Sequence, residues 1–337
     1  MLAAPGPRAE RTTLRDLLPP CGPNEALVLE PAEAAGSLSG NVASRPSARR
    51  GEHRSGTYGP VREHRSTAAT QRSGGAAISR QAPSGTVLYF PGCGSERLYG
   101  SIGLAALHVL QTLGLRVVLP PPFLCCGFPA WANAARVPHG RQTLRDTIVF
   151  SQIREMLAHL SFEAVVVTCG TCHEALGGME AQKIFGAPVV DLLRLAHDRG
   201  LRLRPPEGAL LYHTPCHDGL QGRAPALLAE LGGYRLEPIA HCCSEAGTLA
   251  LSRPDIANAM LHRKRTALLP ALAARPAPER PAVVLTTCPS CISGLGRNAA
   301  LGVEPRHVAV ELAAALSGAG WRETARTQCA SAQALRF

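Results

Sequence analysis

The sequence predicts an α/β protein with two pseudo-symmetric domains, each containing a small parallel sheet flanked by helices. From residue 85 onward, short β-rich runs alternate with helix-like runs. The β-rich runs are continuously apolar, as in parallel sheets covered on both faces. The order of the runs repeats once with a period of about 120 residues. That period is too long for a solenoid and is typical of a duplicated domain.

Residues 1–84 are expected to be a disordered or weakly structured N-terminal region. Residues 36–84 are rich in Ser, Gly, Arg and Thr, so they can bury too little apolar surface to offset the ordering entropy. Residues 11–34 hold at most one weak helix, and the isolated Cys21 is interpreted as an incidental thiol. The N-terminus lacks the apolar stretch of a secretory signal, and we expect no transmembrane helix.

Residues 85–204 form the predicted first domain and residues 205–325 the second, with a C-terminal tail at 326–337. Strands of the first domain are expected at 86–90, 115–120, 164–168 and 187–190, with helices at 98–114, 130–160, 172–184 and 191–200. Strands of the second are expected at 209–213, 234–239 and 282–287 and after 303, with helices at 223–232 and 254–273, after 288, and before 316.

Ten of the twelve cysteines form two copies of one pattern, in which a single Cys precedes a CysCys pair and then a Cys-x-x-Cys pair. The first cysteine set is Cys93, Cys125, Cys126, Cys169 and Cys172. The second cysteine set is Cys216, Cys242, Cys243, Cys288 and Cys291. All of these elements follow predicted strands or precede predicted helices, so the cysteines should meet at the carboxyl edge of each sheet. Helix N-termini at that edge favour thiolates and an anionic group.

The chemistry of such a set leaves three alternatives. Zinc prefers four tetrahedral ligands, which two Cys-x-x-Cys pairs commonly supply, but each half has only one such pair. Adjacent cysteines suit a larger iron–sulfur cluster better, because their side chains diverge along the backbone. Soft thiolates select zinc, copper(I) or iron–sulfur clusters. Iron–sulfur binding is therefore the favoured interpretation, with zinc in at least one half and metal-free dithiol chemistry as alternatives.

Several histidines lie beside the cysteines: His173, His217 and His241 adjoin one, and His213 precedes Cys216 by three residues. Each could donate a hydrogen bond to a cluster sulfur or relay a proton, but the favoured interpretation of each is a polar residue at the mouth of a loop. Glu174 and Glu245 are proton carriers or helix-start carboxylates.

A nucleic-acid partner is not expected, although the formal net charge is +10. The densest basic run is HisArgLysArg at 262–265, and no aromatic stacking platform accompanies it. We therefore interpret this run as the solvated face of a helix.

These motifs resemble the CCG cysteine-rich domain. That domain occurs twice in one of the subunits of heterodisulfide reductase and in iron–sulfur subunits of glycolate, lactate and glycerol-3-phosphate oxidising systems. The resemblance covers residues 85–325 and is strongest in YFPGCGSERL (89–98), LPPPFLCCGFP (119–129), VVVTCGTC (165–172), LYHTPCHDGL (211–220), CCSEAGTLALSRPDIA (242–257) and LTTCPSCISGLGR (285–297). The same motifs are similar to the C-terminal region of FAD-linked glycolate or D-lactate oxidases.

The resemblance implies an electron-transfer protein or oxidoreductase subunit with a [4Fe–4S] cluster, non-cubane in heterodisulfide reductase, on each cysteine set. It implies flavin-containing and ferredoxin-type partner subunits and a quinone or disulfide acceptor. A cytoplasmic location is expected, or a peripheral one at the inner face of the membrane. The alternative function is a zinc- or cluster-stabilised binding module without redox turnover.

Two departures from the family pattern matter. Ser244 replaces the usual Gly after the second CysCys pair, where a positive φ would cost about 1 kcal/mol. The chain also lacks a flavin domain and a ferredoxin-type cysteine run, so it cannot oxidise a substrate alone. It is therefore a subunit that relies on partners or a fragment of a larger flavin-linked oxidase.

Overall fold

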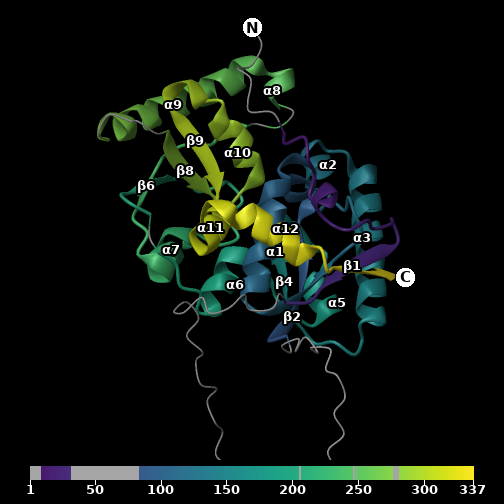
Figure 1. Cartoon of the computed structure of the whole chain (residues 1–337). Helices are drawn as coiled ribbons and strands as arrows, with labels where there is room; N and C mark the ends of the chain where they lie inside the picture. Colours follow the sequence, from purple (N-terminus) through teal and green to yellow (C-terminus); the bar gives the residue numbers. More distant parts are fainter. Residues whose placement is uncertain (1–8, 32–82, 205, 246, 248, 276–280) are drawn as a thin grey trace, which may run out of the picture.

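The computed structural model describes residues 9–31, 83–204, 206–245, 247, 249–275 and 281–337. Two lobes are visible in Figure 1, and each contains one β-sheet whose central strands are parallel. The predicted α/β class with two related halves is confirmed by this arrangement. The sequence-based expectation of disorder over 36–84 lies almost wholly outside the described residues.

The first sheet has six strands in the order β10-β1-β3-β2-β4-β5. Its parallel part consists of β2 (Gly85–Phe90), β3 (Leu115–Leu119), β4 (Phe162–Val167) and β5 (Val189–Asp191). The helical segments of this half are a π-helical turn at Gly94–Leu98, α1 (Gly100–Thr112), α2 (Phe128–Ala132), α3 (Arg136–Met156), α4 (Gly170–Gly178), α5 (Ala181–Phe185) and α6 (Leu192–Asp198).

The second sheet has four parallel strands in the order β7-β6-β8-β9. They are β6 (Leu210–Tyr212), β7 (Leu236–Pro238), β8 (Ala282–Thr286) and β9 (Val303–His307). The helices of this half are α7 (Ala224–Gly232), α8 (Leu249–Ser252), α9 (Pro254–Ala273), α10 (Pro289–Gly296), α11 (Val308–Ser317) and α12 (Trp321–Cys329), with 3-10 turns at Ala299–Leu301 and Gly318–Gly320.

The two halves share one hydrophobic core, because helices near the end of each half pack against helices of the other half. In the first half α6 packs on α7 of the second half, and α11 and α12 pack on α1. The core therefore includes Leu107 of α1, Leu227 of α7, Leu312 of α11 and Trp321 of α12, all buried. Burial of these apolar side chains removes them from water and holds the two sheets in a fixed relation.

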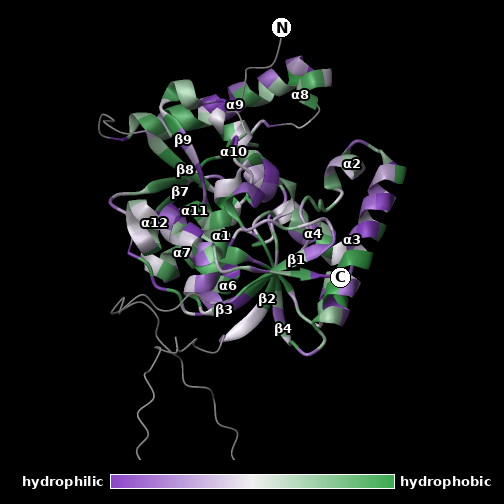
Figure 2. Cartoon of the chain, turned by 45° about the vertical axis from the view of Figure 1, so that its right-hand side comes forward, coloured by the Kyte–Doolittle hydropathy of each residue, from purple (hydrophilic) through white to green (hydrophobic). Residues whose placement is uncertain are grey.

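Two helices cover the outer faces of the sheets, α3 on the first and α9 on the second. Both lie at the periphery of the molecule in Figure 2, with hydrophilic and hydrophobic residues side by side. Each buries one charged residue among its inward-facing apolar positions, Asp146 on α3 and Lys264 on α9. Lys264 corrects the sequence interpretation of 262–265 as a wholly solvated face, since this side chain is fully buried.

Residues near the two ends of the chain complete the first sheet, which the sequence did not predict. A 3-10 turn spans Arg15–Leu17, and β1 (Glu25–Leu29) replaces the weak helix expected within 11–34. β10 (Gln333–Arg336) lies in the segment expected to be a tail. β1 pairs antiparallel with both β3 and β10. The first sheet is therefore mixed, not purely parallel. Among the described residues, no helix is long and apolar enough to cross a membrane.

Candidate functional site: two adjoining cysteine sets

All ten predicted cysteines lie where strands of the two sheets end. Cys93 and Cys216 follow β2 and β6, and the CysCys pairs follow β3 and β7. Cys169 and Cys288 are the N-cap residues of α4 and α10. Parallel strands bring their carboxyl ends to one edge, so segments far apart in the sequence meet there.

Within each half, the five thiols form a chain of neighbours. In the first cysteine set, neighbouring thiols shift one another's pKa in the order Cys93, Cys125, Cys126, Cys172 and Cys169. In the second set, Cys216 Sγ lies 3.9 Å from Cys242 Sγ, and contacts continue through Cys243 and Cys291 to Cys288. All twelve cysteines are free thiols.

The two sets meet at the first cysteine of each Cys-x-x-Cys pair. Cys169 and Cys288 lie side by side across the boundary between the halves, because Cys169 packs against the apolar cluster of the second half that contains Cys288, and each thiol shifts the pKa of the other. The ten thiols therefore form one continuous chain whose order reverses at this contact: Cys93, Cys125, Cys126, Cys172, Cys169, Cys288, Cys291, Cys243, Cys242, Cys216. The sequence predicted each set but did not predict that they adjoin.

The thiol groups differ in acidity because they share protons and backbone donors. Hydrogen bonds from Cys126 and Cys93 lower the pKa of Cys125 to about 3. Hydrogen bonds from Cys172 and Cys288, with backbone N–H groups at the start of α4, lower the pKa of Cys169. In the second set, hydrogen bonds from Cys242 and Cys291 lower the pKa of Cys243. In each set these interactions favour the thiolate form of at least one cysteine, which is the form that binds metals.

The loops that carry the cysteines touch across the boundary at glycines. A Cβ at Gly170 would overlap the carbonyl oxygen of His217, and a Cβ at Gly94 would lie 2.7 Å from the Pro289 side chain. Within the second half, a Cβ at Gly294 would lie 2.6 Å from the carbonyl oxygen of Cys243. Close approach of backbone segments is the reason that glycine is required at these positions.

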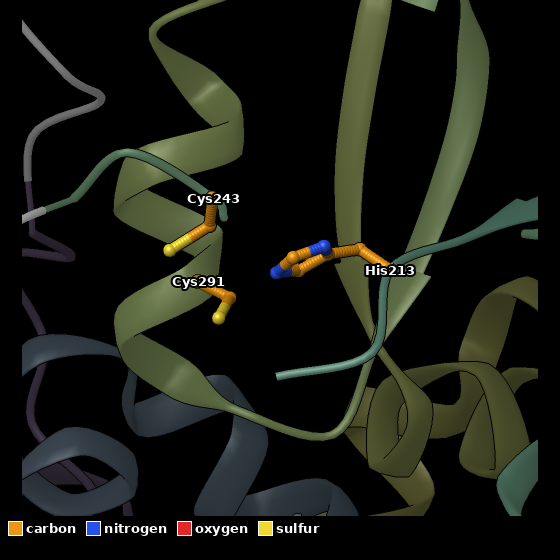
Figure 3. Close-up of side chains that lie close together, drawn as sticks. All are labelled: His213, Cys243 and Cys291. Carbon is orange, nitrogen blue, oxygen red and sulfur yellow. The ribbon is translucent and has the colours of Figure 1, made fainter. Parts of the chain in front are cut away.

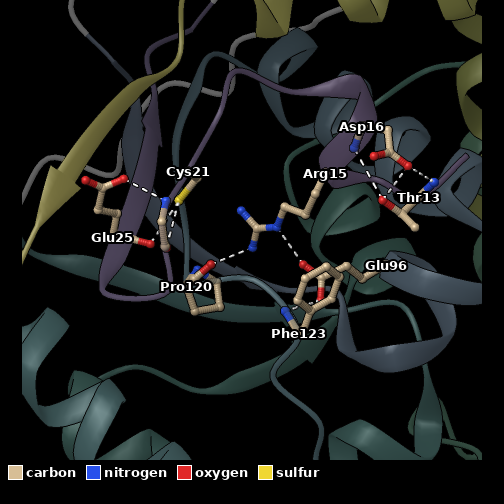
Figure 4. Close-up of polar contacts among 9 residues, drawn as sticks. Thr13, Arg15, Asp16, Cys21, Glu25, Glu96, Pro120 and Phe123 are labelled. Carbon is tan, nitrogen blue, oxygen red and sulfur yellow. Dashed lines mark hydrogen bonds and ion pairs between the residues drawn. The ribbon is translucent and has the colours of Figure 1, made fainter.

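Residues from the N-terminal region brace the first cysteine set, as Figure 4 shows. Arg15 donates to Glu96 at 2.6 Å and to the Pro120 carbonyl, and Glu96 accepts from the Phe123 backbone N–H at 2.8 Å. Glu96 therefore ties the loop after Cys93 to the loop before Cys125. Sequence reasoning missed this bracing, because nothing in the local pattern of residues 11–17 points to a partner at position 96.

Lys264 holds the loop that leads into the second CysCys pair. Its ammonium donates to the backbone carbonyls of Ile239, Ala240 and His241 and to Nδ1 of His213, at 2.9–3.2 Å. Burial lowers the pKa of Lys264 to about 8, while the charges of nearby thiolates oppose this shift. The spacing of Lys264 from Leu261 and Leu268 on the inward face of α9 was the sequence signal for its burial.

His213 faces the second cysteine set from the end of β6. A ring nitrogen of His213 and the sulfurs of Cys243 and Cys291 lie within 4.8 Å of one another, as Figure 3 shows. Because Nδ1 accepts from Lys264, the proton of a neutral imidazole resides on Nε2. This Nε2 is buried without a hydrogen-bond partner, which is uncommon for a buried polar atom. The donor set and this unpaired nitrogen fit a group bound between the thiols.

The other residues that the sequence placed beside the cysteines have polar roles at the boundary. His173 Nε2 lies 3.1 Å from the Val189 carbonyl, and His217 Nδ1 lies 2.6 Å from Glu174. His241 is exposed, and burial raises the pKa of Glu245. His307 was not singled out by the sequence, yet its Nε2 contacts the Thr168 carbonyl at 3.0 Å, directly before Cys169.

Open space adjoins both cysteine sets. A cavity of about 460 Å³ reaches Cys216 and Cys242 and is otherwise lined by Thr214 and residues 238–241. A cavity of about 320 Å³ reaches Cys126, with Phe128, Trp131 and Met179 on its walls. The outer cysteine Cys216 is exposed, whereas Cys93 at the equivalent place is partly buried. Cys216 is therefore the most accessible of the ten cysteines.

The duplicated cysteine pattern identifies the family. The sequence model of the cysteine-rich (CCG) domain matches residues 87–177 and 210–296, which together make up more than half of the chain. The chain belongs to the CCG cysteine-rich domain family. One match falls in each half, and together they confirm the resemblance to the CCG domain that the sequence indicated.

Proteins from several organisms are similar to this chain over part of its length. A fumarate reductase (CoM/CoB) subunit of Methanothermobacter marburgensis is 24% identical over 220 residues, covering 63% of this chain and 42% of that protein. An uncharacterized iron–sulfur protein of Methanocaldococcus jannaschii is 25% identical over 211 residues, with coverages of 61% and 40%. Lactate utilization protein A of Geobacillus kaustophilus is 28% identical over 205 residues, with coverages of 53% and 80%. The match spans about two fifths of the first two relatives.

Among solved structures, glutamate racemase RacE1 from Bacillus anthracis gives a TM-score of 0.33 at 17% identity, over 74% of this chain and 84% of that one. A TM-score this low supports no inference about the CCG halves.

Proposed function

We propose that this CCG protein is an iron–sulfur electron-transfer protein, with one cluster on each cysteine set and electron relay between them. The observation that supports this proposal best is the contact between Cys169 and Cys288, which brings the two cysteine sets together. Two separate structural metal sites would not need to adjoin. An electron relay requires two redox centres that lie close together, because electrons must pass from one centre to the other through the protein.

Cys93, Cys125, Cys126, Cys169 and Cys172 would hold the first cluster, and Cys216, Cys242, Cys243, Cys288 and Cys291 the second. When bound, such a cluster supplies reversible one-electron chemistry at a potential set by its charge and by hydrogen bonds to its sulfurs. The protein supplies thiolates, the N–H groups at the starts of α4 and α10, and glycines that let the loops approach closely.

The finer assignment is a [4Fe–4S] cluster, cubane or non-cubane, in each half of an oxidoreductase subunit. Two of the similar proteins are named as a reductase subunit and an iron–sulfur protein, which supports this assignment. A flavin-containing subunit and a ferredoxin-type subunit would be the partners, and a quinone or a disulfide would be the acceptor. The chain would then serve a 2-hydroxy-acid oxidase or a heterodisulfide reductase-like enzyme.

The test is metal analysis of protein purified without oxygen, with EPR spectra before and after dithionite. Two clusters predict about eight iron and eight sulfide per chain and a redox-dependent signal. Cys126→Ser and Cys243→Ser, made separately, should each remove about half of the iron. Cys21→Ser is the matched control and should remove none, because the Cys21 thiol donates to the carbonyls of Gly22 and Glu25. Unchanged iron in both site variants would refute the ligand assignment.

A zinc-stabilised module is the second candidate, and one observation favours it. His213, Cys243 and Cys291 form a buried group of three ligands of the kind that zinc prefers. Stoichiometric zinc without iron in the same analysis would establish this alternative and exclude the relay. Zinc beside about four iron per chain would place zinc in one half only.

A further inference from the structure

The residue three places before the outer cysteine differs between the halves. Tyr89 and Phe90 end the first strand of the first half, and Tyr212 and His213 stand at the corresponding places in the second. Phe90 packs edge-on against Phe150 of α3, with ring centroids 5.9 Å apart. The first cysteine set therefore has an apolar ring where the second set has a buried imidazole.

The imidazole is held in one tautomer by Lys264. The Lys264 ammonium donates to His213 Nδ1 at 3.1 Å, so the hydrogen of the neutral ring is on Nε2, facing Cys243 and Cys291 (Figure 3). His213 and Lys264 are both almost fully inaccessible to solvent. The second set is thus approached by an N–H donor and, directly behind it, by a buried positive charge.

The outer helix beside the first cysteine set carries a buried carboxyl group where that of the second set carries a buried ammonium. The buried charged residue on its outer helix is Asp146, whose Oδ2 has no hydrogen-bond partner. The cation that acts on Cys125 is Arg97, which is exposed and therefore screened by water. Lys183, the other lysine of the chain, is 69% exposed and paired with Glu180.

We infer that Lys264 and His213 give the second cysteine set the higher reduction potential, so that electrons pass from the first set to the second. The inference rests on the proposed function and adds a direction to it. Reduction adds one negative charge, which a buried ammonium and an N–H donor to sulfur stabilise. In the transfer, one electron leaves a reduced centre on the first set and enters an oxidised centre on the second, and no bond is made or broken.

The test is a potentiometric EPR titration of the oxygen-free holoprotein. Cys126→Ser and Cys243→Ser assign each signal to one cysteine set. In the otherwise unaltered chain, the signal of the second set should have the higher midpoint. His213→Phe, which copies Phe90, should lower the equilibrium constant for its reduction at least tenfold, about 59 mV for one electron. The midpoint of the first set should stay unchanged.

Lys264→Met should shift the same midpoint further in the same direction, and Lys183→Met is the control that removes an equal charge from the surface. If Lys264→Met does not fold, His213→Phe alone decides. Equal midpoint potentials of the two sets in the unaltered chain would overturn the inference. So would a His213→Phe variant in which neither midpoint potential changes, or in which both change. Absence of iron from the unaltered chain would instead overturn the proposed function.

Discussion

The two halves of this CCG protein present the same five cysteines in the same order within different surroundings. The corresponding residues, first half before second, are Phe90 and His213, Gly127 and Ser244, and, on the outer helices, Asp146 and Lys264. The first set is braced by Arg15 and Glu96, and the second lies open at Cys216. The two halves therefore share the cysteine pattern and differ in the charged residues around it.

The largest effect is expected at Gly170, where the backbones of the two halves are in contact. In Gly170→Ala, the new Cβ would overlap the His217 carbonyl oxygen, and neither backbone can yield cheaply. We expect a loss of more than about 3 kcal/mol in the free energy of unfolding, measured by urea denaturation.

Gly177→Ala is the matched control on the same helix, because a Cβ there meets nothing within 4 Å. It should leave stability equal or raise it by up to about 1 kcal/mol, since alanine favours the helix. Similar losses in both variants would show that the contact at Gly170 is not what joins the halves.

The bracing of the first set is tested by Arg15→Met. Arg15 and Glu96 are 10% and 1% exposed, so the variant leaves a buried carboxylate without its cation. We expect a loss of about 3 kcal/mol, with iron lost from the first set and kept on the second.

Arg253→Met removes an exposed pair with Asp255 and should change little. Equal loss of iron from both sets in Arg15→Met would mean that the N-terminal segment supports the whole molecule and not one half.

The charge difference between the outer helices is tested through pH. Burial raises the pKa of Asp146 to about 7 from its usual value of 3.8. The folded state therefore binds a proton more tightly than the unfolded state, so this group's contribution to stability falls as pH rises from about 4 to 7.

Asp146→Asn removes that dependence. In urea unfolding of the reduced, metal-free protein, the variant should be more stable than the unaltered chain by about 2 kcal/mol at pH 8. The difference should shrink toward zero near pH 4. A difference independent of pH would show that Asp146 is not the titrating group.

The smallest effect is expected at the residue after each CysCys pair. Gly127 has φ +78° and Ser244 has φ +69°, a conformation in which a side chain costs about 1 kcal/mol. Ser244→Gly should stabilise by less than about 1 kcal/mol, because glycine also gains entropy in the unfolded chain.

Gly127→Ser is the reciprocal variant and should destabilise, since its Cβ would also lie 2.9 Å from His139 Nδ1. Melting temperatures of the two variants should therefore move in opposite directions. Movement in the same direction would contradict the backbone explanation.

The parallel strands and the positions of the cysteines were predictable, because apolar runs ending in cysteine report both features locally. The contact between Cys169 and Cys288 was not predictable, because it depends on how two halves pack. The positive φ at Ser244 was foreseen as a cost from the glycine at the matching position, and the structure confirms that φ is positive.

Contacts between residues far apart in the sequence could not be predicted either, because they also depend on tertiary packing. Arg15 pairs with Glu96 across 81 positions, and β1 pairs with β10 across about 300. A short strand such as β1 acquires its conformation from its neighbours, so its own pattern is weak. Lys264 lay on the apolar stripe of its helix, but its charge suggested the surface.

The pairing of β1 with β10 also has a consequence for synthesis on the ribosome. Ala26 lies opposite Leu335 in this ladder, so the edge of the first sheet cannot close until Leu335 has been synthesised. Until then α1 lacks its packing partners α11 and α12, so its apolar side chains are exposed to non-native contacts. Such long-range closure is slow. If metal were bound to the first half during translation, it would therefore bind to an incompletely folded lobe. Chaperones would have the longest time to bind this half.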